Sequence, residues 1–557
     1  MALSKTDIDV QAETPQARAD RNANHHESEF SMLGFDHGVY YYLPKGSGQI
    51  VHLKANQHVE ANLIEIAPRQ FWEEKYNSGK GADWKSAANA LIRRQHAIGV
   101  YNVSRVRGRG AWWDKDHAVV HVGDHVIIKG KALPLSTPSK YIYEASQPYP
   151  ISPENPLDAK SAYQLIEICK LISWEKPINA YYLAGWVALA PVGGALNWRP
   201  HIWITAAAES GKSWVMREIV GRILNGIAIG SQSCTTEPAI RGELNNGSLP
   251  VIFDEAESKS KVEKLRMDAV VGLARAASTE GGDPIMKANP DGSVRKTFIR
   301  SMFSFSSISY PLTKPEDMRR ITPLGIVKDG NIMRFEQLKM LTARIITDEF
   351  CARFPARSIA MIPIIRQNSR IFSAAIIEKF GSQGMGDQYG MLLAGAWSLF
   401  SDRVATQDEA EKWVAERNAE GAWIEQKAQA EESDEVQCLA YLMQSVIRSQ
   451  GPRGVIEMSV AELMRISSST TGDLRQDWAV ETLGRYGFRG DVDGMVISST
   501  HGGVGGILKD TPWARNWART LGRLPGASST EGGVRFGAVK TRGIEIPYPA
   551  DPDDEDD

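Results

Sequence analysis

The chain has 557 residues, of which 42% are hydrophobic and 24% are charged. This composition is ordinary for folded globular domains, and the length suggests three or four of them. A formal net charge of −3 excludes a uniformly basic nucleic-acid coat, so any nucleic-acid site has to be a local patch. The four cysteines form no CxxC pair, which argues against a zinc site or a disulfide framework and fits a reducing cytosol.

The beginning of the chain predicts a tail followed by a small mixed domain. Residues 1–28 are polar and lack periodicity, so we expect a disordered tail without a signal peptide. Residues 29–150 predict an α+β domain: GVYYYLP and GQIVHL alternate like paired strands around a Lys-Gly-Ser-Gly turn. A helix is expected over 83–96, and a further strand pair around AVVHVGDHVII.

Arginines and tryptophans lie close together in the middle of this domain. Arg105, Arg107 and Arg109 precede Trp112 and Trp113. Cations beside stacking surfaces suit a nucleic-acid strand. The same pattern fits tryptophans in a core with arginines along a solvated edge, and the sequence alone favours this second interpretation.

Residues 151–330 predict a nucleotide-hydrolase core with helices in front of it. The segment 157–190 is helical and apolar in pattern. The run 180–198 is long enough to cross a membrane, but Pro191 and the two glycines at 193–194 interrupt it. We therefore expect a buried helix and a tight turn, and no membrane segment.

A phosphate-binding loop is expected directly after this region. An apolar strand at 202–205 leads into Ala-Ala-Ala-Glu-Ser-Gly-Lys-Ser at 206–213, and an amphipathic helix begins near Trp214. Strand, small-residue loop and helix form the context in which backbone N–H groups cradle phosphates. Lys212 would contact the β- and γ-phosphates, and Ser213 would bind Mg²⁺. The expected ATP-binding residues of the loop are Ala206, Glu209, Ser210, Gly211, Lys212 and Ser213.

A second motif follows about forty residues later. The apolar segment 249–253 ends in Asp254 and Glu255. Asp254 would complete the ATP and Mg²⁺ site through the metal's water shell, and Glu255 would polarise the attacking water. The alternative is that the two motifs are only a glycine-rich turn and an exposed acidic cluster. The strand before each motif favours a nucleotide hydrolase instead.

Two further elements follow the acidic pair. A charged helix precedes residues 280–298, where Asn-Pro-Asp-Gly lies between two extended runs and predicts a hairpin. Its Lys287, Arg295 and Lys296 are candidate nucleic-acid contacts, although a surface hairpin with ordinary lysines is an equal alternative. The next strand, at 302–309, offers only serines (306, 307 and 309) as sensors of the γ-phosphate.

Arg319 and Arg320 precede another apolar strand. Such a guanidinium can reach the nucleotide of a neighbouring subunit and offset charge on the transferring phosphoryl group. The alternative is a local pair with Glu316 or Asp317. The pattern favours the first interpretation, an arginine finger that reaches the nucleotide of the neighbouring subunit.

The remainder predicts a helical lid region at 331–432 and a separate domain at 433–547 after a charged break. Helices followed by a β-pair suggest a winged-helix-like α+β unit that binds a duplex or a partner protein, with a purely structural domain as an equal alternative. Residues 548–557 form an acidic tail.

Several runs resemble the helicase-type ATPase region of phage and prophage DNA primase/helicase proteins, which are similar to virus-type superfamily 3 helicases and AAA+ ATPases. These runs, spread over roughly 30–547, include 184–205 before the phosphate loop, 249–257, 317–321, 386–395 and 511–517. The resemblance implies an α/β P-loop fold and a hexameric ring with ATP between subunits. It also implies Arg320 as the finger acting in trans. The family usually has glycines where this chain has Ala206 and Glu209, and no primase half is evident.

The sequence therefore predicts a cytoplasmic ATP-dependent DNA helicase or translocase of phage-type replication, in a bacterial or phage-infected cell. Its cofactors would be ATP and Mg²⁺, and its partners single-stranded DNA, further copies of itself and replication proteins. One alternative is a nucleotide-dependent initiator or loader that does not unwind processively. Another is a regulatory ATPase that does not act on nucleic acid.

Overall fold

The computed structural model describes residues 28–548 apart from several short segments. These segments are 208–209, 233, 255, 257–259, 283, 289–293, 309–311, 313–314, 419–433, 452–453, 469–473, 491–493 and 510. The chain divides into two compact units, Met1–Ala422 and Trp423–Asp557, and each is described by itself. Nearly all of both expected tails, 1–28 and 548–557, lies outside the described residues.

Unit 1 begins with a three-stranded antiparallel sheet covered by helices. The predicted pair is confirmed as β2 (Val39–Pro44) and β3 (Val51–Lys54). A strand that the sequence did not predict, β1 (Phe30–Asp36), lies on the other side of β2. The helices are η1 (Ala55–Gln57), α2 (Glu60–Ile66), α3 (Arg69–Lys75) and α4 (Trp84–Ile98). Trp72 is fully buried at the centre of this core.

A second, four-stranded antiparallel sheet follows in the order β5-β6-β7-β8. Its strands are β5 (Gly110–Asp114), β6 (His117–His121), β7 (His125–Ile128) and β8 (Lys131–Pro134). The short parallel pair β4 (Val106–Arg107) and β9 (Ile142–Tyr143) accompanies it, preceded by η2 (Val103–Arg105). The predicted strands around 118–128 are confirmed as β6 and β7.

The centre of unit 1 is a five-stranded parallel sheet in the order β11-β12-β15-β10-β16. The strands are β10 (His201–Ala206), β11 (Ile229–Ser231), β12 (Val251–Phe253), β15 (Phe303–Ser307) and β16 (Ile321–Ile326). In the central strands β10 and β15 nearly every side chain is buried, as expected for a parallel sheet covered on both faces. The order separates β10 from β12 by β15.

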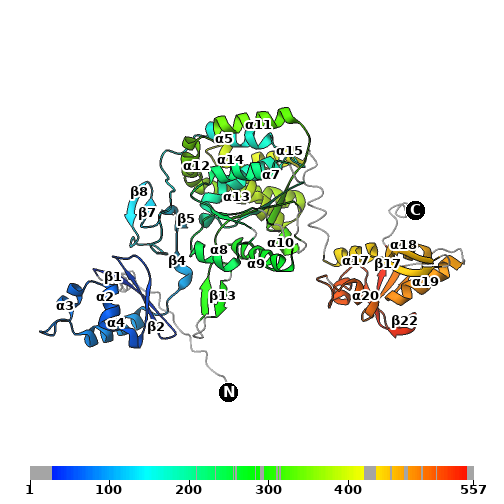
Figure 1. The fold of residues 1–557 in the computed structure, drawn as a ribbon, viewed down its shortest axis with the longest axis horizontal. Helices are drawn as coiled ribbons and strands as arrows, with labels where there is room; N and C mark the ends of the chain where they lie inside the picture. The colour runs from blue at the N-terminus through cyan, green and yellow to red at the C-terminus, as the bar shows by residue number, and fades with distance from the viewer. Residues whose placement is uncertain are drawn as a thin grey trace, which may run out of the picture. The chain divides into compact units, whose positions relative to one another are not determined.

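Helices cover both faces of this sheet; Figure 1 shows α8 and α9 on one side and α5 and α11 on the other. The helices before the sheet are α5 (Ala159–Lys170), α6 (Asn179–Leu189) and η3 (Ala190–Ala195). Within it follow α7 (Lys212–Val215), the π-helical turn η4 (Met216–Gly221), α8 (Glu237–Leu244), α9 (Lys261–Ala277) and α10 (Pro315–Met318). After it come α11 (Ile332–Ile345), α12 (Asp348–Ala360), α13 (Ile362–Phe380), α14 (Gln383–Phe400) and α15 (Gln407–Asn418).

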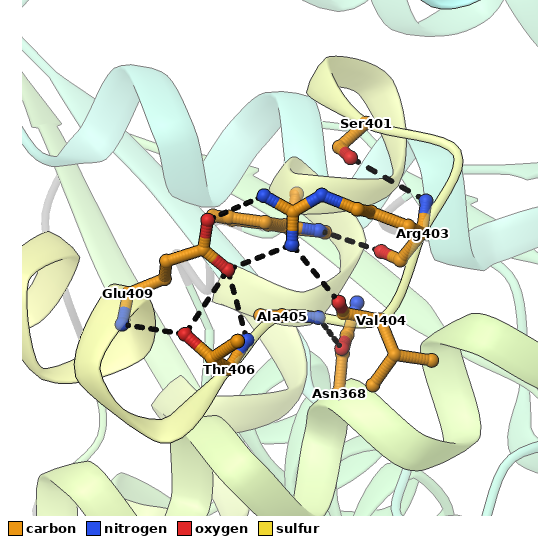
Figure 2. A network of polar contacts seen from close by, with 8 residues as sticks. Asn368, Ser401, Arg403, Val404, Ala405, Thr406 and Glu409 are labelled. Carbon is orange, nitrogen blue, oxygen red and sulfur yellow. Dashed lines mark hydrogen bonds and ion pairs between the residues drawn. The ribbon is translucent and has the colours of Figure 1, made fainter.

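The turn between α14 and α15 is held by polar contacts (Figure 2). Both carboxylate oxygens of Glu409 accept from the Arg403 guanidinium, and one of them also accepts the backbone N–H of Thr406 at 2.9 Å. The amide oxygen of Asn368 on α13 accepts the N–H of Ala405 at 2.8 Å. The Arg403 hydrogen bonds are the main reason that the pKa of Glu409 falls to about 2. The network fixes where α15 begins.

A buried histidine joins the central sheet to α9. The Nδ1 atom of His201 accepts the backbone N–H of Phe303 at 3.0 Å, and its Nε2 atom lies 2.6 Å from the carbonyl oxygen of Ala274. Because these partners require an uncharged ring that donates from Nε2, the histidine is structural. Its burial lowers its pKa to about 3.

The described part of unit 2 contains three longer helices, two short ones and a four-stranded antiparallel sheet in the order β19-β20-β24-β21. The helices are α17 (Asp434–Gln444), α18 (Val460–Ser467) and α19 (Leu474–Tyr486), with short α20 (Gly502–Ile507) and α21 (Trp517–Leu521). The strands of the sheet are β19 (Phe488–Gly490), β20 (Gly494–Ser498), β21 (Ser528–Ser529) and β24 (Gly543–Pro547). Two hairpins accompany them, β17 (Val446–Gly451) with β18 (Gly454–Ser459), and β22 (Val534–Phe536) with β23 (Val539–Thr541).

Among the described residues, no helix has both the length and the apolarity needed to cross a membrane. The run at 180–198 forms buried α6 and the tight helical turn η3, as expected from its sequence.

Candidate nucleotide site at the carboxyl edge of the central sheet

The predicted loop leaves the carboxyl end of β10 and enters a helix. Gly211 has φ +85°, a left-handed conformation that favours glycine, and it directly precedes α7. Lys212 is the first residue of α7, and Ser213, the second, is exposed. The indole of Trp214 packs edge-on against the Phe335 ring of α11, with 5.6 Å between ring centroids. This contact fixes the helix whose first N–H groups face the loop.

Ala206 is buried as the last residue of β10, and Ser210 donates its N–H to the Ala207 carbonyl oxygen at 3.3 Å. Glu209 lies outside the described residues.

The predicted acidic residue follows β12. Asp254 donates its backbone N–H to the Ser231 carbonyl oxygen at 3.1 Å, and its carboxylate accepts the Ser306 hydroxyl. Two residues on, Ala256 donates its N–H to the Ser306 carbonyl oxygen at 2.7 Å. Hydrogen bonds to β11 and β15, the two neighbours of β12, therefore hold Asp254 and Ala256. Glu255 lies outside the described residues.

Strand register brings these groups to one edge of the sheet. Phe253 pairs with Phe305, and Phe305 pairs with Trp203, in parallel strands. Asp254 therefore follows β12 at the level of Ser306, two residues short of the end of β10. Open parallel sheets bind ligands outside the carboxyl ends of their strands. The structure thus brings the start of the phosphate loop and Asp254 to this edge.

The serines considered as sensors have different environments. Ser306 contacts Asp254, whereas the Ser307 hydroxyl accepts the Trp203 indole N–H at 2.7 Å inside the sheet. Ser309 lies outside the described residues. Ser306 contacts the acidic motif through its hydroxyl, and this contact depends on strand order and has no signal in the sequence.

Arg320 lies at the opposite edge of the sheet, directly before β16. Its guanidinium donates to the Glu316 carbonyl oxygen at 2.9 Å and lies 5.9 Å from the centre of the Trp198 ring. Burial, and next the charge of Arg275, lower its pKa. Arg320 thus closes locally on the Glu316 backbone, while the carboxylates of Glu316 and Asp317 form ion pairs with Arg275. Arg319 beside it is exposed.

The predicted hairpin is confirmed as β13 (Ile285–Ala288) and β14 (Val294–Thr297). Lys287 forms an ion pair with Glu237 of α8 at 3.1 Å. Lys296 pairs in register with Met286, and both are exposed. Because neighbouring positions on a strand point to opposite faces, Lys287 and Lys296 lie on different faces of the hairpin. The Arg295 side chain is outside the described part of the chain.

In the first domain Trp112 is a core residue, as the second interpretation expects, but Arg107 is also buried and does not lie on a solvated edge. Trp112 is buried, with the Arg107 guanidinium 5.0 Å from its ring centre. Arg105 donates to the Lys140 carbonyl oxygen, and Arg109 forms an ion pair with Glu243. Trp113, which is partly exposed, has the guanidinium of Arg366 at 4.9 Å.

Comparison with known proteins yields only distant structural likeness. No family model and no curated protein matches the chain. A solved structure titled "SCCmec type IV Cch - active helicase" is 11% identical over 93% of each chain, with a TM-score of 0.44. One titled "The A form apo structure of NrS-1 C terminal region-CTR" is 11% identical over 77% of this chain and 96% of that one, with a TM-score of 0.28. At these TM-scores the likeness carries no functional weight.

Proposed function

We propose that the protein is an ATP-dependent DNA helicase or translocase that hydrolyses ATP between the subunits of a hexameric ring. The ring would move on single-stranded DNA during phage-type replication in the cytosol, together with replication proteins. The observation that supports this most directly is the convergence of the phosphate loop and Asp254 at the carboxyl edge of one parallel sheet.

The residues present fit a magnesium–nucleotide complex. The turn at Gly211 and the first N–H groups of α7 are donors suited to phosphate oxygens. Ser213 offers a hydroxyl and Asp254 a carboxylate, the oxygen ligands that Mg²⁺ prefers. When bound, the metal would neutralise charge on the β- and γ-phosphates.

In this proposal each side chain has one task. Lys212 binds the phosphates and Ser213 and Asp254 hold the metal. Ser306 orients Asp254 through its hydroxyl. Glu255, assigned from the sequence alone, accepts a proton from the attacking water.

The arginine before β16 would serve a neighbouring subunit. His201 pairs with Ile321 and Ala206 with Ile326, so Arg320 precedes β16 at the far end of the sheet from its own loop. At about 3.3 Å per residue, five steps place the loop roughly 17 Å from the start of β16. A guanidinium there would be too far from a nucleotide at its own loop, which supports a role in trans.

Steady-state ATP hydrolysis with and without single-stranded DNA tests the motor. Lys212→Ala should abolish turnover, whereas Lys160→Ala, which removes an exposed lysine of α5, should leave it unchanged. Glu255→Gln should bind ATP and hardly hydrolyse it. Persistent turnover in pure Lys212→Ala protein would overturn the phosphate-loop assignment. Equal loss of binding and turnover in Glu255→Gln would count against its role on water.

Mixed rings test the finger. Arg320→Ala subunits mixed with Glu255→Gln subunits should regain activity, because some interfaces then combine an intact arginine with an intact glutamate. Arg319 is the more exposed of the two arginines, so the same mixture is also made with Arg319→Ala subunits. The variant that is inactive alone and regains activity in the mixture identifies the arginine that acts across the interface. Absence of rescue with either variant at every mixing ratio would mean that neither acts across an interface.

A forked-duplex assay separates the helicase from its alternatives. Strand displacement that requires hydrolysis supports the proposal. Specific duplex binding without displacement would instead indicate an initiator or loader. Hydrolysis that single-stranded DNA does not stimulate would indicate an ATPase that does not act on nucleic acid.

A further inference from the structure

A cavity of about 330 Å³ lies at the amino edge of the central sheet, away from the phosphate loop. Its wall combines Ser104 and Arg107 of the first domain with Arg199, which precedes β10. The segments 279–282 and 298–300, on either side of the β13–β14 hairpin, complete it. Its volume is in the range of small-molecule sites.

Three arginines line this cavity, and two are almost fully buried. Arg107 is 7% exposed and Arg199 is 1% exposed, while Arg300 is partly buried. Long cationic side chains are rarely buried unless an anion accompanies them, because the charged group loses its hydration. Their burial therefore calls for a compensating partner.

Within the described part of the chain, these arginines contact backbone carbonyls and aromatic rings. The Arg107 guanidinium lies 3.8 Å from the centre of the Tyr141 ring, and the Arg300 guanidinium lies 4.9 Å from the centre of the Phe298 ring. Arg107 donates to the carbonyl oxygens of Ser104 at 2.6 Å and Val106 at 2.9 Å, and its Nε atom has no partner. Arg300 donates to the Ser104 carbonyl oxygen at 3.2 Å. Arg199 donates to three carbonyl oxygens, those of Gly193, Leu196 and Ala277. Carbonyls satisfy hydrogen bonds but carry no net charge.

The charges in the wall do not balance. Glu280 is the one carboxylate among the residues that line the cavity, and it is exposed. Within the part of the chain that the structure describes, none of the three arginines forms an ion pair with a carboxylate. Burial, and next the charges of Arg107 and Arg199, lower the pKa of Arg300 to about 9. Crowded guanidinium groups with one exposed counterion make the cavity attractive to an anion.

We propose that this cavity binds a phosphate group, with Arg107, Arg199 and Arg300 as its cationic wall. Guanidinium groups match phosphate oxygens through paired N–H donors, and they are less strongly hydrated than lysine ammonium groups. The phosphate is that of a small free phosphate compound or of a nucleic-acid backbone at the base of the hairpin. The inference does not depend on the proposed function, because the cavity and the phosphate loop lie at opposite edges of the sheet.

The test uses the full chain with Lys212→Ala, which removes the lysine proposed to bind phosphate at the loop. Titration calorimetry with inorganic pyrophosphate, and fluorescence anisotropy with a labelled ten-nucleotide oligothymidylate, measure the two sources of phosphate. Adding Arg300→Gln should weaken binding in at least one arm by about ten- to a hundredfold, the loss expected for one charge-assisted contact. The arm that weakens identifies the source.

Arg334→Gln is the matched control. Arg334 is partly buried and donates to the carbonyl oxygens of Lys170, Leu171 and Ile172, but it does not line the cavity. Its loss should change neither affinity by more than about twofold. If Arg300→Gln does not fold, Arg300→Lys keeps the charge without the paired donors and should still weaken binding. Absence of binding in both arms, or affinities that neither Arg300 variant changes, would overturn the proposal.

Discussion

Two glycines allow α6 and α14 to cross at very short range, and this crossing gives a sharp stability prediction. A Cβ atom added at Gly185 would lie 2.1 Å from the Leu392 carbonyl oxygen, where ordinary contact begins at 3.4 Å. A Cβ atom added at Gly395 would lie 2.5 Å from the Gly185 carbonyl oxygen. Both obstacles are backbone atoms, which cannot rotate away as a side chain can.

Gly185→Ala therefore forces the helices apart by about 1 Å, a gap that forfeits a quarter to a half of the dispersion energy of each contact. Overpacking of this kind costs about 3 kcal/mol. Gly242→Ala is the matched control, because Gly242 is also helical but its added Cβ atom would meet nothing within 4 Å. This control should gain about 0.8 kcal/mol from helix propensity.

Scanning calorimetry of the full chain measures the difference. At about 2 °C per kcal/mol for a large unit, Gly185→Ala should lower the Tm of unit 1 by roughly 6 °C, and Gly242→Ala should raise it by 1–2 °C. Similar shifts for the two variants, in either direction, would refute the close helix crossing.

Three further outcomes are expected. Because the folded-state pKa of His201 is depressed to about 3, the unfolded state gains protons first as pH falls below about 6.5. Urea unfolding should therefore show that His201→Gln removes about 2 kcal/mol of the destabilisation that the wild type suffers between pH 7 and pH 5; identical pH profiles would contradict this. Ser306→Ala removes the hydroxyl that Asp254 accepts, so metal-dependent ATP turnover should fall about tenfold while unfolding changes little, and unchanged turnover would exclude this role. Lys296→Ala should reduce the slope of log affinity for single-stranded DNA against log salt concentration by about 0.7. Lys287→Ala should reduce it by less, because Glu237 already pairs with Lys287. Equal slopes for the wild type and both variants would exclude the hairpin as a DNA contact.

Local patterns predicted the elements that carry the candidate site. The strand before the phosphate loop, the acidic strand and the hairpin are all found, because each depends on a short apolar run beside a turn or loop signal. The first strand was missed because Gly34 interrupts its alternation. A Cβ atom there would lie 2.4 Å from the Gly99 carbonyl oxygen, so a tertiary contact requires this glycine.

Long-range geometry could not be predicted. The run PWARNWARTLGRL at 512–524 has the pattern of one helix, yet α21 spans only Trp517–Leu521. The indoles of Trp513 and Trp517 donate to Asp434 and to the Ser498 carbonyl oxygen, and these contacts hold the preceding turns. Strand order, and with it the Ser306 contact, likewise depends on pairing between segments far apart in the sequence. The cluster of three arginines around the cavity also joins segments far apart in the sequence, so it could not be predicted either.

Strand β15 lies between the strand that leads into the candidate phosphate loop and the strand that leads to Asp254. Neighbouring strands are about 4.8 Å apart, so β10, which leads into the candidate phosphate loop, and β12, which leads to Asp254, stand about 10 Å apart, with Ser306 near the carboxyl end of β15 between them. A substitution at Ser306 changes the hydrogen bond to Asp254 and the space between the two motifs, while the residues of both motifs stay the same. Under the proposed function, this single central position would therefore set the rate of hydrolysis without any substitution in the loop that binds the nucleotide.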